Sequence, residues 1–288
     1  MVLWDGSLPV DKEAEWSRGG DVRGCAPEPS DLKGHKVSVA TFKLIVEYDG
    51  SGYHGWQRQP DRPTIQAALE EAIQRLTGIA TRVYGAARTD AGVHALGQVA
   101  HFVSEARFTP AAWTRGLNAL LPGDIAVRRV ARVRETFHAR HGARWKIYRY
   151  DIYNHPCRAP LCRRYAWHLF QPLNLGAMRR AARAIVGCRD FRSFCAADSE
   201  GDHFTVDLKS VVVSKDDAQV RLTFRADRFL KYMVRNMVGF LVEVGRGHRA
   251  PDEVTAVLAA RDRRRAGPTA PPHGLTLVRV LYGTSDVR

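Results

Sequence analysis

The run Phe42-Lys-Leu-Ile-Val-Glu47 sets the first element of the fold, because its apolar and β-branched residues predict a strand. A helix is expected at residues 63–76, where apolar side chains recur at helical spacing from Ile65 to Leu76. The elements expected next are strands at 82–86 and 98–103, a helix at 109–121 and a strand at 125–133. The order strand–helix–strand–strand–helix–strand is that of a split βαβ unit.

The remainder of the chain repeats this order. The expected elements are a strand at 144–153, a helix at 175–186, a hairpin of 205–214 and 219–226, helices at 229–244 and 252–260, and a strand at 275–281. The sequence therefore predicts an α+β protein of two tandem ferredoxin-like (RRM-like) halves. This fold hosts many functions, RNA binding among them, so it does not identify the activity.

Three regions are expected along the chain. Residues 1–40 lack periodicity and contain several glycines and prolines, so we predict a flexible N-terminal extension. An N-terminal α/β half at 41–140 and a C-terminal α/β half at 141–285 follow, with their boundary in the loop at 137–143. Neither half contains an apolar run near the 18 residues of a membrane span, so no membrane segment is expected.

The charge balance points to an anionic partner. The 288-residue chain carries 44 Lys and Arg against 30 Asp and Glu, a formal charge of +14. The first 40 residues hold more acids than bases, so the whole excess lies in the predicted halves. Arginine greatly outnumbers lysine and suits phosphate binding, although a GC-rich genome also enriches arginine. The composition excludes a wholly disordered chain, a collagen-like fibre and a disulfide-rich miniprotein.

The cysteines suggest a cytoplasmic protein without a structural metal. Their count is odd and none forms a C-x₂-C pair, which argues against disulfides and zinc sites. The chain start has no basic segment followed by an apolar one, so no signal peptide is expected. We expect reduced thiols at Cys25, Cys157, Cys162, Cys188 and Cys195.

An acid flanked by small residues is the most unusual feature. Asp90 lies in Arg88-Thr-Asp-Ala-Gly-Val-His94, between two expected strands. Neighbouring alanines and glycines let a substrate backbone approach the carboxylate. The alternative is an Asx turn, in which Asp90 bonds its own backbone. His94 alone is more often a satisfied hydrogen-bond partner than a catalyst.

Two further segments carry candidate site residues. On the strand Lys146-Ile-Tyr-Arg-Tyr150, Tyr148 and Tyr150 share a face that suits base stacking, although cross-strand tyrosine packing is the commoner use. The helix expected at 229–244 is apolar on nearly every side yet contains Arg235. A buried arginine needs a carboxylate partner, unless its head reaches water.

Taken in order, these segments resemble the tRNA pseudouridine synthase A family. The similarity runs from about residue 41 to 282. Any one motif is weak evidence, but their succession is specific. The motifs are Glu47-Tyr-Asp-Gly50, Arg88-Thr-Asp-Ala-Gly-Val-His94, Leu117-Asn-Ala-Leu-Leu-Pro122, Phe137-His-Ala-Arg140, Lys146-Ile-Tyr-Arg-Tyr150, Asp190-Phe-Arg-Ser-Phe194, Met233-Val-Arg-Asn236 and Ala266-Gly-Pro-Thr269.

The resemblance implies an isomerase that converts uridine to pseudouridine in the anticodon stem-loop of tRNA, at tRNA positions 38–40. It also implies that no cofactor or metal is needed, that the enzyme is a homodimer, and that the two sheets join into one central sheet with a catalytic cleft. Asp90 would be the catalytic nucleophile, Arg235 its ion-pair partner, and Tyr148 the residue that stacks on the base and could act as general base. The substrate-binding residues would be Arg88, His94, Gln57 and Arg58.

Two other classes of function remain as alternatives at this stage. A non-catalytic RNA-binding module could retain the same fold, and a small-molecule enzyme could have a basic surface. The chain has no G-x₄-G-K-[S/T] phosphate loop and no strand-linked G-x-G-x-x-G, which weakens the second. The acid, tyrosine and arginine together favour the isomerase.

Overall fold

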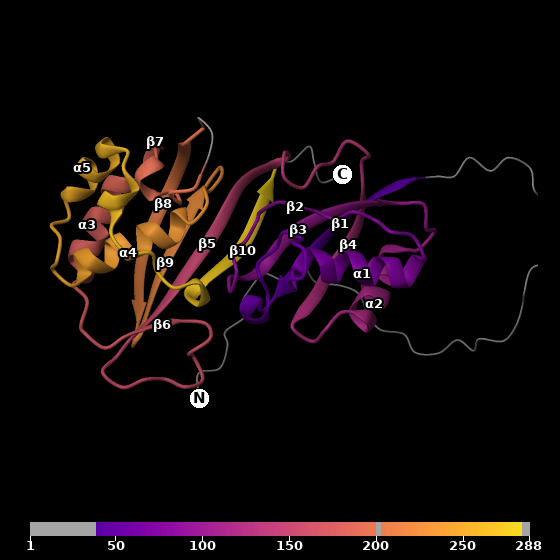
Figure 1. Cartoon of the computed structure of the whole chain (residues 1–288), viewed down its shortest axis with the longest axis horizontal. Coiled ribbons are helices and arrows are strands. Elements are labelled where there is room, and N and C mark those ends of the chain that lie inside the picture. Colours follow the sequence, from indigo (N-terminus) through magenta and orange to yellow (C-terminus); the bar gives the residue numbers. More distant parts are fainter. Residues whose placement is uncertain (1–38, 200–202, 284–288) are drawn as a thin grey trace, which may run out of the picture. The chain divides into compact units, whose positions relative to one another are not determined.

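A computed structural model describes residues 39–199 and 203–283, whose strands join into one mixed sheet (Figure 1). Most of the extension expected at 1–40 lies outside the described residues. The described elements of residues 39–140 are β1 (Ala40–Tyr48), α1 (Ile65–Thr77), β2 (Tyr84–Gly85), β3 (His94–Ser104), α2 (Pro110–Leu120) and β4 (Ile125–Val133). In the described ranges, no helix has the length and apolarity needed to span a membrane.

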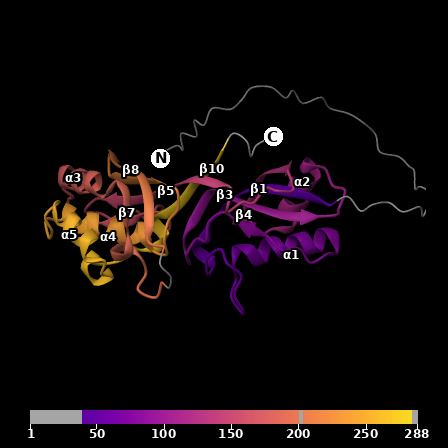
Figure 2. The same ribbon diagram turned by 90° about the horizontal axis from the view of Figure 1, so that it is seen from above.

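The elements that follow build the other side of the sheet. They are β5 (Ala143–Asn154), β6 (Trp167–Leu169), α3 (Leu175–Ile185), β7 (Gly187–Asp190), β8 (Thr205–Asp216), β9 (Gln219–Ala226), α4 (Met233–Gly245), α5 (Glu253–Ala260) and β10 (Leu275–Tyr282). Figure 2 shows α1 and α2 beside β1 and β4, and α3, α4 and α5 gathered around β7 and β8.

The strand order brings sequence-distant segments to one place. The sheet runs β4-β1-β3-β10-β5-β9-β8-β7, with β2 on β3 and β6 on β5. The last strand, β10, pairs parallel with β3 and antiparallel with β5. Leu277 of β10 lies opposite both Ala95 of β3 and Tyr148 of β5. The start of β3 therefore lies two strand spacings, about 10 Å, from Tyr148.

Capping residues and aromatic packing explain why the helices form where they do. Thr64 caps α1 and Thr109 caps α2, each accepting a hydrogen bond from a backbone N–H three residues on. Trp113 of α2 packs on Phe42 of β1 and Phe102 of β3 with ring centroids 5.5 and 4.9 Å apart. These rings form the core under the α1 and α2 layer.

The structure differs from the predicted elements in several places. The helix expected from residue 229 begins only at Met233, because Tyr232 has a φ of 61° and cannot continue a helical turn. Strand β2 is shorter than expected, and β3 begins at His94 rather than at 98. The short strands β6 and β7 were not predicted, and each pairs with one neighbouring strand, β6 with β5 and β7 with β8. A three- or four-residue strand carries too little periodicity to be recognised.

Candidate active site

Asp90 lies in the tight turn between β2 and β3. Thr89, its neighbour, is fixed on both sides: its carbonyl accepts from the backbone N–H of Trp56 at 3.0 Å, and its hydroxyl bonds the Tyr48 hydroxyl at 2.8 Å. The side-chain amide of Gln98 in β3 accepts a hydrogen bond from the Ala87 N–H and donates one to the Ala87 carbonyl. The residues just before Asp90 are therefore anchored to β1 and β3.

The shape of the turn also depends on the loop after β1, whose backbone packs closely against it. A Cβ on Gly50 would overlap the carbonyl oxygen of Val93, three residues after Asp90. Only glycine leaves room there. At Gly52, in the same short 3₁₀ turn, a Cβ would meet no atom within 4 Å.

We expect Gly50→Ala to displace the turn and to lower both stability and activity. Overpacking of this kind costs about 1–3 kcal/mol, and a shift of about 1 Å at a catalytic carboxylate costs roughly 100-fold in rate. Thermal unfolding and single-turnover kinetics measure the two effects. Gly52→Ala is the matched control, and equal behaviour of the two variants would contradict the packing argument.

Arg235, near the N-terminus of α4, points at Asp90. Its Nη1 lies 3.4 Å from the Asp90 Oδ2, and the two side chains are 14% and 22% exposed. In the described part of the chain, Arg235 is the hydrogen-bond partner found for this carboxylate, so the Asx-turn alternative does not hold. Burial raises the pKa of Asp90 above its ordinary value, while the Arg235 charge and hydrogen bond oppose that rise.

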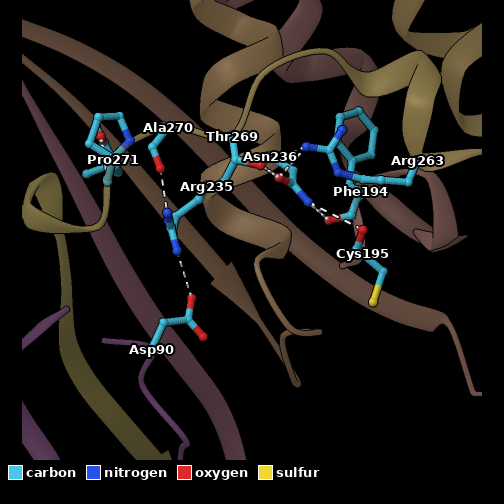
Figure 3. A network of polar contacts seen from close by, with 10 residues as sticks. Asp90, Phe194, Cys195, Arg235, Asn236, Arg263, Thr269, Ala270 and Pro271 are labelled. Atoms are coloured by element: carbon cyan, nitrogen blue, oxygen red, sulfur yellow. Dashed lines mark hydrogen bonds and ion pairs between the residues drawn. The ribbon is translucent and has the colours of Figure 1, made fainter. Parts of the chain in front are cut away.

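A second set of contacts holds Arg235 in place (Figure 3). Its Nε donates to the Ala270 carbonyl at 2.8 Å, and its own carbonyl accepts from the Ala270 N–H at 3.1 Å. The neighbouring Asn236 accepts at Oδ1 from Thr269 and Arg263. These bonds clamp the segment before β10 onto α4, so the guanidinium is oriented before any substrate binds.

Tyr148 of β5 lines the same cleft. Its ring is 6% exposed and meets Phe229 edge-on with centroids 5.0 Å apart. Burial raises the pKa of Tyr148 far above its ordinary value, and the nearby Tyr48 and Asp90 add to this. The hydroxyl is therefore protonated at neutral pH, which suits packing against a base better than proton abstraction by a phenolate.

These groups line a cleft of about 900 Å³. Asp90 is the one carboxylate among the residues described along its wall. The cations along the wall are Arg82, Arg88, Arg140, Lys146, Lys231 and Arg235. Such a cleft attracts a polyanion and presents it to a single acid. No three His, Cys, Asp or Glu side chains in the described ranges are grouped so as to hold a metal ion.

The four residues expected to bind substrate fall in different places. Arg88 is exposed on the cleft wall and Gln57 lies at its edge. Arg58 lines a smaller neighbouring pocket of about 490 Å³, where it pairs with Glu70 at 2.9 Å. Two of the four residues, Arg88 and Gln57, therefore line the cleft.

His94 is 4% exposed and is not among the residues described along the cleft wall. Its Nδ1 accepts from the Gly50 N–H at 3.1 Å, and its Nε2 faces the carbonyls of Arg164 and His273. The ring thus joins three loops, and its contact with substrate stays a prediction.

Lys146 was not among the candidate residues, although it lines the cleft beside Tyr148. Its position two residues before Tyr148 on the expected strand could have indicated it, because alternate residues share a face.

A basic cleft with one carboxylate among the residues described along its wall is the arrangement expected of an enzyme that acts on a nucleic acid. A family model described as tRNA pseudouridine synthase matches residues 44–141 and 181–283. The chain belongs to the tRNA pseudouridine synthase family. The matched ranges include Asp90, Arg235 and the residues of the turn that hold Asp90, whereas Tyr148 lies between them.

Individual relatives agree with the family match. A protein of Moorella thermoacetica named tRNA pseudouridine synthase A is 49% identical over 243 residues, covering 84% of this chain and 99% of that protein. Proteins of the same name from Syntrophotalea carbinolica and Myxococcus xanthus are 45% and 47% identical. They cover 86% and 84% of this chain, and 98% and 91% of their own lengths. The family recognised from the motifs is confirmed, and with it the class of enzyme, an isomerase acting on tRNA.

Proposed function

We propose that this chain converts uridine to pseudouridine at positions 38–40 in the anticodon stem-loop of tRNA, with Asp90 as nucleophile. The observation that carries the proposal is the Asp90–Arg235 pair at 3.4 Å, on the wall of a basic cleft that also presents Tyr148. The names of the relatives supply the reaction and the substrate class.

The reaction needs the groups found here. The N1–C1′ bond breaks, the uracil turns, a C5–C1′ bond forms, the C5 proton leaves and N1 gains a proton, so no oxidant or cofactor is consumed. Ionised Asp90 either attacks C1′ or removes the 2′ proton to give a glycal. Arg235 favours the ionised form and fixes its direction. Tyr148 supplies a flat surface for the uracil; its hydroxyl, protonated at neutral pH, is less suited to the other role expected of it, accepting the C5 proton.

A base inside a stem must leave the stack before the carboxylate can reach its sugar. Flipping costs a few kcal/mol. Arg88, exposed on the cleft wall two residues before Asp90, is placed to fill the gap that the uridine leaves. Gln57 at the cleft edge is the second candidate for contact with the RNA.

We also infer that the sheet consists of two tandem ferredoxin-like halves, residues 41–140 and 141–285. Each half has the same strand order: β4-β1-β3-β2 in the first and β10-β5-β9-β8 in the second. With the short strands β6 and β7 left out, numbering the four strands of each half along the chain gives the order 4-1-3-2, the arrangement expected of a split βαβ unit. The cleft then lies where the halves join, since β3 and β10 make the seam.

A homodimer in the cytoplasm, working without metal, completes the proposal. Exposed apolar side chains support self-association: Leu161 is 94% exposed and Phe170 64%. Light scattering that gives twice the 32.2 kDa of one chain would support the dimer.

The test of the activity is release of tritium from C5-labelled uridine in a tRNA transcript. The wild-type chain is expected to release one tritium for each pseudouridine formed. A transcript with cytidine at positions 38–40 is the matched control and should release none above background. Tight binding of tRNA without release would instead make the chain a non-catalytic RNA-binding module.

A further inference from the structure

Lys146 of β5 is a half-buried cation without an acidic partner. Among the described residues, no carboxylate lies within ion-pair distance of it. Asp227, the acid whose charge acts on Lys146, already accepts hydrogen bonds from the backbone N–H groups of Asp207 and Arg228 at 3.0 and 2.7 Å. A half-buried cation with no ion-paired acid is costly, so the position of Lys146 favours the binding of an anion.

The surroundings of Lys146 are themselves cationic. Arg140 precedes β5 and Arg228 follows β9, and both repel the ammonium charge, while Asp227 attracts it. Burial, followed by Arg140, lowers the pKa of Lys146 to about 8. From β10, the residue opposite Lys146 is the apolar Val280. Three cations therefore act on this place, and among the described residues Asp227 alone is found to attract the Lys146 charge.

The place of Lys146 in the cleft relates it to the reacting base. Lys146 and Tyr148 are alternate residues of β5, so both point to the face that lines the cleft. Their Cα atoms lie about 7 Å apart along the strand. A nucleotide spans a similar distance between its base and a backbone phosphate. A base packed on Tyr148 therefore brings a phosphate within reach of Lys146.

We propose that Lys146, together with Arg140, binds a phosphate of the tRNA backbone beside the nucleotide whose base packs against Tyr148. The inference rests on the proposed function, because it places the phosphate from the position of the uridine. A compact ammonium and a neighbouring guanidinium suit a phosphate, which carries full charge, better than a base edge. The contact fixes the position of the backbone and reads no sequence.

Binding of tRNA by wild type and by Lys146→Met, measured at four salt concentrations, tests the proposal. Loss of one phosphate contact should reduce the slope of log K against log[salt] by about 0.9 and weaken binding at low salt roughly tenfold. Lys215→Met, an exposed lysine near the β8–β9 turn, is the matched control and should leave both unchanged. The weakening should be the same for transcripts with uridine or cytidine at 38–40.

Lys146→Arg supplies a second measurement that does not depend on removing the charge. From pH 7 to 8.5 the wild type should lose affinity several-fold more than Lys146→Arg, because the lysine loses its proton near pH 8 and the arginine does not. An unchanged salt slope in Lys146→Met, or equal pH responses of wild type and Lys146→Arg, would overturn the phosphate site. Tritium release by the wild-type chain tests the proposed function separately.

Discussion

Asp90→Asn is expected to lower the rate of pseudouridine formation by at least about 10⁴-fold while tRNA still binds. The amide keeps the size of the carboxylate but neither attacks C1′ nor accepts a proton, and either loss removes the chemical step. Because the turn is fixed by Thr89, Gln98 and Gly50 rather than by the carboxylate, its shape should survive. Single-turnover kinetics with labelled tRNA, at saturating enzyme, isolate this step.

Stability measurements separate a lost reaction from a lost fold. Burial raises the pKa of Asp90, so keeping this side chain ionised in the folded protein costs free energy. The neutral amide avoids that cost, and the free energy of unfolding of Asp90→Asn should lie within about 1 kcal/mol of the wild-type value. Asp217→Asn, at the exposed β8–β9 turn, is the matched control and should be fully active. Turnover of Asp90→Asn at the wild-type rate would remove Asp90 from the site.

The raised pKa of Asp90 also fixes the sign of its pH dependence. The proposed reaction needs the ionised form, so activity should fall as the pH drops through a value above the ordinary 3.8 of an aspartate. Stability responds in the opposite sense: the Asp90 contribution is largest below the ordinary pKa and is lost as the pH rises through the raised one.

The repeated strand–helix order was readable from sequence because each element carries its own periodicity and caps. The joining of the strands into one sheet was expected from the family resemblance alone, because the β3–β10 pairing rests on a two-residue register between segments about 180 positions apart. The start of α4 was misplaced because an apolar run does not reveal that Tyr232 adopts a left-handed conformation.

The site shows the same division between local and long-range information. The need for an acid near Arg235 followed from an apolar helix, and the structure brings Asp90 there from 145 positions away. The sequence left open whether the Asp90 side chain formed an Asx turn, because the contact that argues against it comes from Arg235 on α4. His94 lies in the most distinctive motif, yet its ring joins loops instead of facing the cleft.

Arg235→Met is expected to abolish activity and to destabilise the fold by about 3 kcal/mol. Methionine preserves the packed stem but removes the bonds to Asp90 and to the Ala270 carbonyl, leaving a partly buried carboxylate uncompensated. The expected loss lies at the low end of the range for buried pairs because both side chains retain some exposure to water. Without the Arg235 charge the pKa of Asp90 should rise further, and any residual activity should need a higher pH than the wild type.

Arg235→Lys distinguishes charge from geometry. A lysine keeps the positive charge but has one nitrogen, so it cannot contact Asp90 and the Ala270 carbonyl together as the guanidinium does. Relative to Arg235→Met, we expect Arg235→Lys to regain most of the lost stability but little of the lost reaction rate. Arg180→Met, an exposed arginine on α3, is the helical control and should change neither. If Arg235→Met were as stable and active as that control, the Asp90–Arg235 pair would have no role in the reaction. Full activity of Arg235→Lys would show that the positive charge alone suffices and that the orienting bond to Ala270 does not matter.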